Sequence, residues 1–250
     1  MDQPILILGA LREEINLIRK LMIVKEQLKA GQADAWVGSW EGVSIVLVRT
    51  GMGKDCALSG LKGVLSRTVP ALVISIGYAG GLDLRLKVGD LVVADKVSEI
   101  DHAGTFSKSY LVNTQQPDLF EGLTSQKQIM IYRGTLLTTN QVISDSSVKQ
   151  ELGYTHKALA VDMETSSLIR HCIKKQIPFV SVRAISDTME QSLINTSSFV
   201  DEEGNVSKIK AGWYAATHPS AIKNLISLRS QSQKATANLT EILRLFLRAL

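Results

Sequence analysis

Three carboxylates at the two ends of the segment 161–187 have the residue types and spacing for chemistry on a small polar molecule. Asp162 and Glu164 stand at the start of a predicted helix, and Asp187 directly follows the apolar strand PFVSVRAIS. A carboxylate at a helix start and another at a strand end can face one cleft from two sides. Such a pair could hold the hydroxyl groups of a sugar and transfer a proton to a leaving group.

Each acid also has a simpler structural interpretation. Asp187 is the hardest to explain structurally, because an acid at a strand mouth is partly buried, which favours the proton-donating form of a carboxyl group. Glu164 could accept two hydrogen bonds from a vicinal diol, and Asp162 could share that role or cap the helix. Glu13 and Glu14 begin the first predicted helix, where position alone indicates a favourable interaction with the helix dipole.

The elements that must position these residues follow from the apolar pattern. Short apolar runs predict strands at 5–8, 35–40, 43–49, 72–76, 91–97, 129–138 and 179–185, and helices are predicted at 11–24, from 54 to before Pro70, at 147–152 and at 161–176. Residues 77–81 are expected to form a loop, and 99–128 to be irregular. Buried strands separated by helices indicate an α/β domain with a largely parallel sheet.

Glycine turns follow several of these strands. Ligands of α/β sheets bind beyond the carboxyl ends of the strands, so Gly9, Gly51, Gly77 and Asp187 are expected to share one edge. The Gly51-x-Gly53-Lys54 turn lacks the upstream glycine and the Ser/Thr of a P-loop, and no dinucleotide fingerprint follows the first strand.

Composition sets broader limits. A chain of 250 residues with 45% hydrophobic content predicts one domain spanning residues 1–250. A net charge of +4 is weak evidence for nucleic acid binding, so no nucleic acid partner is expected. Two cysteines without clustered spacing favour a reducing, cytoplasmic location, and the four scattered histidines predict no metal site. No apolar run approaches the ~18 residues that a membrane span needs.

Residues 201–250 are expected to form a basic amphipathic C-terminal extension. From Ser207 onwards there are seven Lys/Arg and one acid, Glu241, and apolar residues recur at helical spacing: Leu225, Ile226, Leu228, Leu239, Ile242, Leu243, Phe246 and Leu247. The favoured interpretation is a helix packed on the sheet with a solvated basic face. The alternative is a helix that also makes peripheral contact with an anionic membrane surface or with an apolar substrate tail.

Five segments, in this order, resemble the nucleoside phosphorylase/nucleosidase superfamily: ILGALREEI, RTGMGKDCA, SIGYAGGLDLRLKVGDLVVADKV, VDMETSSLI and PFVSVRAISD. The resemblance covers nearly the first 190 residues and is greatest to 5′-methylthioadenosine/S-adenosylhomocysteine nucleosidases and hopanoid-associated nucleoside phosphorylases. It implies a three-layer α/β/α fold around a mixed, partly barrel-like central sheet. It also implies cleavage of the N-glycosidic bond of a purine nucleoside, with adenine as the expected base and without a metal or redox cofactor. A homodimer is expected.

The resemblance also implies residue roles. Asp187 matches the acid that protonates the purine at N7, and Ser186 helps to orient it. Glu164 matches the glutamate that holds the ribose 2′ and 3′ hydroxyls, Met163 packs on the sugar, and Glu14 matches the carboxylate that activates water. The remaining substrate-binding positions implied by the resemblance are Val142 and Ile143 in the base-binding segment and Tyr78, Ala79 and Gly80 in the glycine loop beside the nucleophile.

Departures from the family pattern keep the nucleophile open. Tyr78 replaces a small Ser of the nucleosidases, and Ser75 stands where bacterial purine phosphorylases place a phosphate-binding Arg, a role that Arg12 or Arg49 could take over. Val142 replaces an aromatic residue that commonly stacks on the base. The presence of Glu14 and the missing Arg favour hydrolysis.

The long C-terminal segment favours another substrate, because it looks like the tail of the hopanoid-associated type. Phosphorolysis of a lipid-linked adenosine, with inorganic phosphate as co-substrate, is therefore the main alternative to hydrolysis of a methylthioadenosine-like nucleoside. A pyrimidine-type phosphorylase and a nucleoside-binding protein without turnover are further alternatives. The intact Asp187, Glu164 and Glu14 argue against the last of these.

Overall fold

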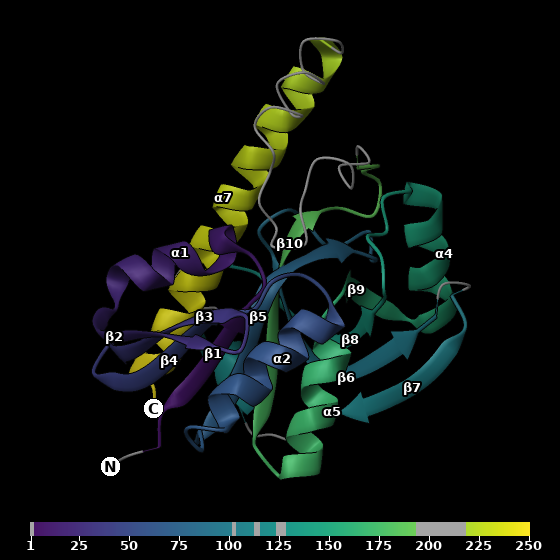
Figure 1. The fold of residues 1–250 in the computed structure, drawn as a ribbon. Helices are drawn as coiled ribbons and strands as arrows, with labels where there is room; N and C mark the ends of the chain where they lie inside the picture. Colours follow the sequence, from purple (N-terminus) through teal and green to yellow (C-terminus); the bar gives the residue numbers. More distant parts are fainter. Residues whose placement is uncertain (1–2, 102–103, 113–115, 124–128, 194–218) are drawn as a thin grey trace.

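A computed structural model describes residues 3–101, 104–112, 116–123, 129–193 and 219–250 (Figure 1). Within these residues, ten strands form one sheet: β1 (Ile5–Gly9), β2 (Ile23–Ala30), β3 (Ala33–Trp40), β4 (Val43–Arg49), β5 (Leu72–Gly81), β6 (Leu91–Ile100), β7 (Phe106–Leu111), β8 (Ile131–Thr138), β9 (Ala158–Asp162) and β10 (Phe179–Asp187). The helices are α1 (Arg12–Leu21), α2 (Lys54–Leu65), α3 (Gln116–Leu123), α4 (Ser146–His156), α5 (Thr165–Lys175) and α7 (Pro219–Arg248).

The sheet is mixed and partly closed, as the resemblance implied, rather than largely parallel. Its strand order is β10-β6-β8-β9-β5-β1-β4-β3-β2, with β7 beside β6. β5 pairs in parallel with β10 and antiparallel with β9, so β5, β10, β6, β8 and β9 close into a ring. The antiparallel pairings of β10 with β6 and of β5 with β9 create this closure, and strand composition alone does not reveal them.

Helices cover the two faces of the sheet (Figure 1). On one face, α1, α3 and α7 contribute Ile15, Phe120 and Leu243 to a core shared with β1, β5 and β10. On the other, α2 and α5 contribute Leu61 and Ile169 to a second core. The expected three-layer α/β/α arrangement is therefore confirmed.

Several predicted elements differ from the structure; the helix predicted at 147–152, for example, runs from Ser146 to His156. The first helix ends at Leu21 rather than at residue 24, and the following residues form β2, whose Ile23 is 70% exposed. β2 is exposed over most of its length, so it lacks the buried apolar face by which strands are recognised. The segment 99–128 is not purely irregular, because it contains β7 and α3.

Two further differences concern the segments that carry the predicted site. The glycine-rich segment 77–81 continues β5 instead of forming a loop. The helix predicted at 161–176 begins only at Thr165, because the residues up to Asp162 form β9. Asp162 is therefore the last residue of a strand, and Glu164 is the N-cap of α5.

The C-terminal helix packs on the sheet as the favoured interpretation predicted. Leu239, Ile242, Leu243, Phe246 and Leu247 of α7 are buried, and Phe246 stacks on Phe120 with ring centroids 4.5 Å apart. The other end of α7 projects past the sheet (Figure 1). The structure does not describe residues 201–218 of the predicted C-terminal extension. It also does not describe the side chains of Leu225, Ile226 and Leu228. None of the helices described is long and apolar enough to cross a membrane.

Candidate active site

The predicted site residues meet in one cavity at the carboxyl ends of β1, β5 and β10. The cavity has a volume of about 220 Å³. It is lined by Ala10, Leu11, Glu14, Met52, Tyr78, Ala79, Gly80, Thr139, Gln141, Val142, Ile143, Val161, Asp162, Met163, Glu164, Ser186, Asp187 and Leu193. Every position that the sequence assigned to catalysis or substrate binding is among them. Glu14 comes from α1, Glu164 from the turn between β9 and α5, and Asp187 from the end of β10.

Glu14 is held by backbone amides at the start of α1. Its Oε2 accepts hydrogen bonds from the N–H groups of Ala10 at 2.7 Å and Leu11 at 2.8 Å, and its Oε1 accepts one from Tyr78 at 2.9 Å. Burial raises the pKa of Glu14, while these amides and the charge of Arg183 act in the opposite direction. Glu14 therefore does more than interact favourably with the helix dipole, because its hydrogen bond from Tyr78 joins α1 to β5 at the cavity.

Arg183 is a cation beneath this carboxylate that the sequence interpretation missed. It lies within β10, is 1% exposed, and donates from Nε to Asp162 at 2.9 Å and from Nη2 to Ser75 at 2.8 Å. Its Nη1 has no hydrogen-bond partner among the described residues. A methyl group on Gly77 would lie 2.8 Å from Glu14 Oε1 and 3.2 Å from Arg183 Nη1, so the absent side chain of Gly77 lets both charges lie against β5. The sequence feature that could have identified Arg183 is its position as a charged residue inside the mostly apolar strand at 179–185.

Glu164 joins two helix starts. It is the N-cap of α5, and its Oε1 accepts a hydrogen bond at 2.7 Å from the N–H of Gly53, the N-cap of α2. Burial and the charge of nearby Asp162 raise the pKa of Glu164 to about 7. A partly buried carboxylate that lines a cavity can accept hydrogen bonds from adjacent hydroxyls.

Asp162 is bound mainly by protein groups around it rather than left open to the cavity. Its Oδ2 accepts from Arg183 Nε and from both the N–H and the hydroxyl of Thr165, and its Oδ1 accepts from Thr138 at 2.7 Å. These bonds occupy both oxygens. They favour the capping role over the shared ribose-binding role, although Asp162 does line the cavity.

Asp187 is buried at 4% exposure and fixed through both carboxylate oxygens. Ser186 donates to Oδ1 at 2.7 Å, and the ammonium group of Lys149 donates to Oδ2. Lys149 is the second cation that the sequence interpretation missed, since its segment was predicted only as a short helix. The predicted orienting contact from Ser186 is present.

Tyr78 directs its side chain away from the nucleophile region. Its hydroxyl lies 2.5 Å from that of Thr236 on α7, whereas its backbone N–H points to Glu14. Burial raises the pKa of Tyr78. The ring packs against the apolar core shared with α7, and its hydroxyl lies next to that of Thr236.

Cavity walls of mostly apolar character surround these polar groups. Met163, Val142 and Ile143 line the cavity as predicted, with Val142 60% exposed. Ala79 and Gly80 form its floor on β5, and a methyl group on Gly80 would lie 3.2 Å from Asp187 Oδ2.

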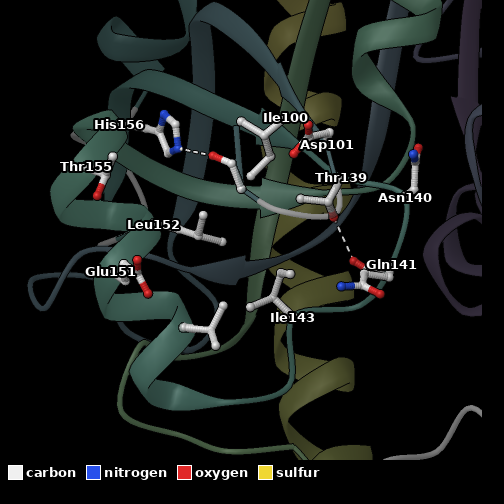
Figure 2. A pocket seen from close by; sticks show the side chains of 12 residues that line it. Ile100, Asp101, Thr139, Asn140, Gln141, Ile143, Glu151, Leu152, Thr155 and His156 are labelled. Atoms are coloured by element: carbon white, nitrogen blue, oxygen red, sulfur yellow. Dashed lines mark hydrogen bonds between the residues drawn. The ribbon is translucent and has the colours of Figure 1, made fainter. Parts of the chain in front are cut away.

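A second cavity of about 180 Å³ adjoins the first and shares Thr139, Gln141 and Ile143 with it. Figure 2 shows α4 on one side of it, with His156 bonded to the carbonyl of Gly104 at 3.1 Å. None of the four carboxylates of the first cavity lines this one, so it is not the primary candidate for catalysis.

Arg12 and Arg49, the suggested phosphate-binding residues, line a different cavity together with Asp34. Arg49 donates to Asp34 at 2.6 Å. Neither arginine lines the cavity of Glu14 and Asp187. The expectation that Arg12 or Arg49 takes over the role of the missing phosphate-binding Arg is therefore wrong. Among the described side chains, no group of three or more His, Cys, Asp or Glu is arranged to hold a metal ion.

Solved structures share this fold over nearly the whole chain. The 5′-methylthioadenosine/S-adenosylhomocysteine nucleosidase of Neisseria meningitidis, in complex with methylthio-immucillin-A, is 21% identical with a TM-score of 0.77, covering 99% of this chain and 100% of that one. The Helicobacter pylori nucleosidase of the same name, with butyl-thio-DADMe-immucillin-A, is 22% identical with a TM-score of 0.78 and full coverage of both chains. Futalosine hydrolase of Helicobacter pylori is 23% identical with a TM-score of 0.77, covering 99% and 98%.

The sequence itself matches a family model. The model of the phosphorylase superfamily matches residues 4–212, which include all four carboxylates of the cavity. This chain therefore belongs to the phosphorylase superfamily.

Proposed function

We propose that this protein hydrolyses the N-glycosidic bond of an adenosine-type nucleoside and releases adenine. The observation that carries the proposal is that Glu14, Glu164 and Asp187 line one cavity of about 220 Å³. Membership of the phosphorylase superfamily supports N-glycosidic cleavage. The nucleosidase and futalosine hydrolase structures named above support hydrolysis at the level of the shared fold.

In the proposed reaction, Asp187 acts on the leaving base. Breaking the bond puts positive charge on the ribosyl ring and negative charge on the departing purine. Asp187 takes up a proton from solvent before the bond breaks and gives it to N7, which neutralises the base, an effect typically worth 10²–10⁴-fold. Ser186, which donates to Asp187 at 2.7 Å, holds the carboxyl group toward the cavity.

Glu164 and Glu14 act on the sugar and on water. Glu164 accepts hydrogen bonds from the 2′ and 3′ hydroxyls and, as an anion, stabilises the positive ribosyl ring. Glu14 accepts a proton from the attacking water through Oε1, which receives a single hydrogen bond from the described residues. Arg183, whose Nη1 lies beside the same position of β5, adds a positive charge that favours the ionised form of Glu14. These proton transfers and charges need no redox cofactor.

Water is preferred over phosphate because the two suggested phosphate-binding residues, Arg12 and Arg49, lie at another cavity. Phosphorolysis of a lipid-linked adenosine remains the outcome that the test must distinguish. The predicted homodimer, the cytoplasmic location and peripheral contact with a membrane stay predictions.

The test is an adenine-release assay on a panel of 5′-substituted adenosines, with and without phosphate. We expect release without phosphate and a loss of at least about 10²-fold in Asp187→Asn, because a positioned proton donor contributes that much. Near-normal turnover of Asp187→Asn would remove its assigned role, and strict dependence on phosphate would show phosphorolysis instead.

A further inference from the structure

Helix α4 carries a lysine in the protein interior, Lys149, which is 0% exposed. The start of the helix is fixed by Asp145, whose side chain accepts hydrogen bonds from the N–H groups of Ser147 at 2.7 Å and Val148 at 3.3 Å. Removing an ammonium group from water costs several kcal/mol, and a buried ion pair is weak evidence for stability. The position of Lys149 therefore calls for an explanation other than stability.

All three N–H donors of the Lys149 ammonium group are used. Nζ donates to Oδ2 of Asp187, to the carbonyl of Thr188 at 3.1 Å and to the carbonyl of Gln191 at 2.8 Å. An ammonium group has three donors and no acceptor, so this set saturates it. Lys149 thus binds the predicted proton donor and the turn that follows it through one atom.

The turn after Asp187 is fixed by the same region. The N–H of Thr188 donates to the side-chain oxygen of Gln191 at 3.0 Å, and the N–H of Leu193 donates to the carbonyl of Ser144 at 2.8 Å, just before α4. Leu193 lines the cavity. Loss of Lys149 would therefore free the carboxyl group of Asp187, while Leu193 would keep its hydrogen bond to Ser144.

Contacts on the other side of Asp187 leave it one orientation. Ser186 donates to Oδ1, and the backbone of Gly80 lies so close that an added methyl group would be 3.2 Å from Oδ2 and 3.8 Å from Cε of Lys149. With Oδ2 directed to Lys149, Oδ1 is the oxygen left for Ser186 and for a ligand in the cavity.

We propose that Lys149 is a positioning residue for leaving-group protonation: it holds the carboxyl group of Asp187 in the orientation that faces the departing base. This inference rests on the proposed function. Lys149 acts through Asp187 and is not itself in contact with the cavity, since it is absent from the lining residues.

Two substrates with different leaving groups test this role. One is 5′-methylthioadenosine, whose adenine needs a proton to depart, and the other is the matching nitrophenyl riboside, whose nitrophenolate departs without one. For Lys149→Met we expect kcat for adenine release to fall about 10- to 100-fold, within the range of general acid catalysis. The loss on the nitrophenyl riboside should be at least about tenfold smaller, whereas a purely structural defect would affect both substrates alike.

Lys149→Met leaves the charge of Asp187 buried without its partner, so this variant could fold poorly. A double-mutant cycle with Asp187→Asn tests the role of Lys149 even in that case. Lys149→Met in the Asp187→Asn background removes both charges, and we expect no further loss of adenine release, because Lys149 acts only through Asp187. Arg49→Met is the matched control: it breaks the ion pair with Asp34 at another cavity. It should not distinguish the two substrates.

The outcomes separate the inference from the proposed function. Equal losses on both substrates in Lys149→Met, or an additional loss of about tenfold or more in the double variant, would overturn the positioning role. If the unaltered protein turns over neither substrate, the proposed function fails, and the inference fails with it.

Discussion

At the scale of single residues, the ionisation of Glu164 should control substrate binding. Burial raises its pKa to about 7, so near neutrality only part of the empty sites hold the carboxylate that ribose hydroxyls require. A carboxyl group is ionised above its pKa, so KM should fall as pH rises through about 7. The measurement is KM for 5′-methylthioadenosine over this pH range.

Glu164→Gln provides the control for that prediction. The amide keeps one acceptor oxygen but does not titrate, so its KM should be higher at alkaline pH and should lose the dependence due to Glu164. Any remaining dependence would report Glu14, whose pKa burial also raises. An unchanged pH dependence in Glu164→Gln would show that another group controls binding.

The sequence predicted the four cavity carboxylates but not the two cations, of which Lys149 bonds Asp187 and Arg183 bonds Asp162. Asp187 and Glu164 stand next to recognisable strand and helix boundaries, which makes acids visible there. Lys149 lies inside helix α4 and Arg183 inside strand β10. Their hydrogen-bond partners, Asp187 and Asp162, are 38 and 21 positions away in the sequence. Such long-range pairs have no local pattern, so only the three-dimensional arrangement identifies them.

At the scale of elements, the hydroxyl of Tyr78 connects β5 to α7. It lies 2.5 Å from the hydroxyl of Thr236, in a partly buried position. We expect Tyr78→Phe and Thr236→Val each to lower the free energy of unfolding by about 1 kcal/mol, the usual value of such a hydrogen bond. Because both variants remove the same bond, the double variant should lose less than the sum. Urea unfolding measures all three, and strictly additive losses would contradict the contact.

Several strands that are mostly buried were located closely. β1, β4 and β10 are of this kind. β2 is mostly exposed, and β9 has only five residues followed at once by the turn into α5, so neither has a distinctive period. The continuation of β5 through its glycines depends on pairing with β9 and β10, which is a tertiary effect.

At the scale of the whole molecule, α7 is part of the core rather than an appendage. Phe246 is 0% exposed and stacks on Phe120 of α3. Phe246→Ala should therefore lower the free energy of unfolding by about 3–5 kcal/mol, as for other buried aromatic residues. Arg248→Ala, two residues further on and 53% exposed in its pair with Glu41, should cost less than about 1 kcal/mol. Denaturant unfolding compares the two, and equal small losses would contradict a core role for α7.

Turnover in water labelled with heavy oxygen, without phosphate, tests the central claim most directly. If Glu14 activates water and Asp187 protonates the base, mass spectrometry should find one labelled oxygen in the ribosyl product and none in the adenine. The rates at which the labelled ribosyl product and the adenine form should fall together in Asp187→Asn. An unlabelled ribosyl phosphate formed only after phosphate is added would contradict hydrolysis at this cavity.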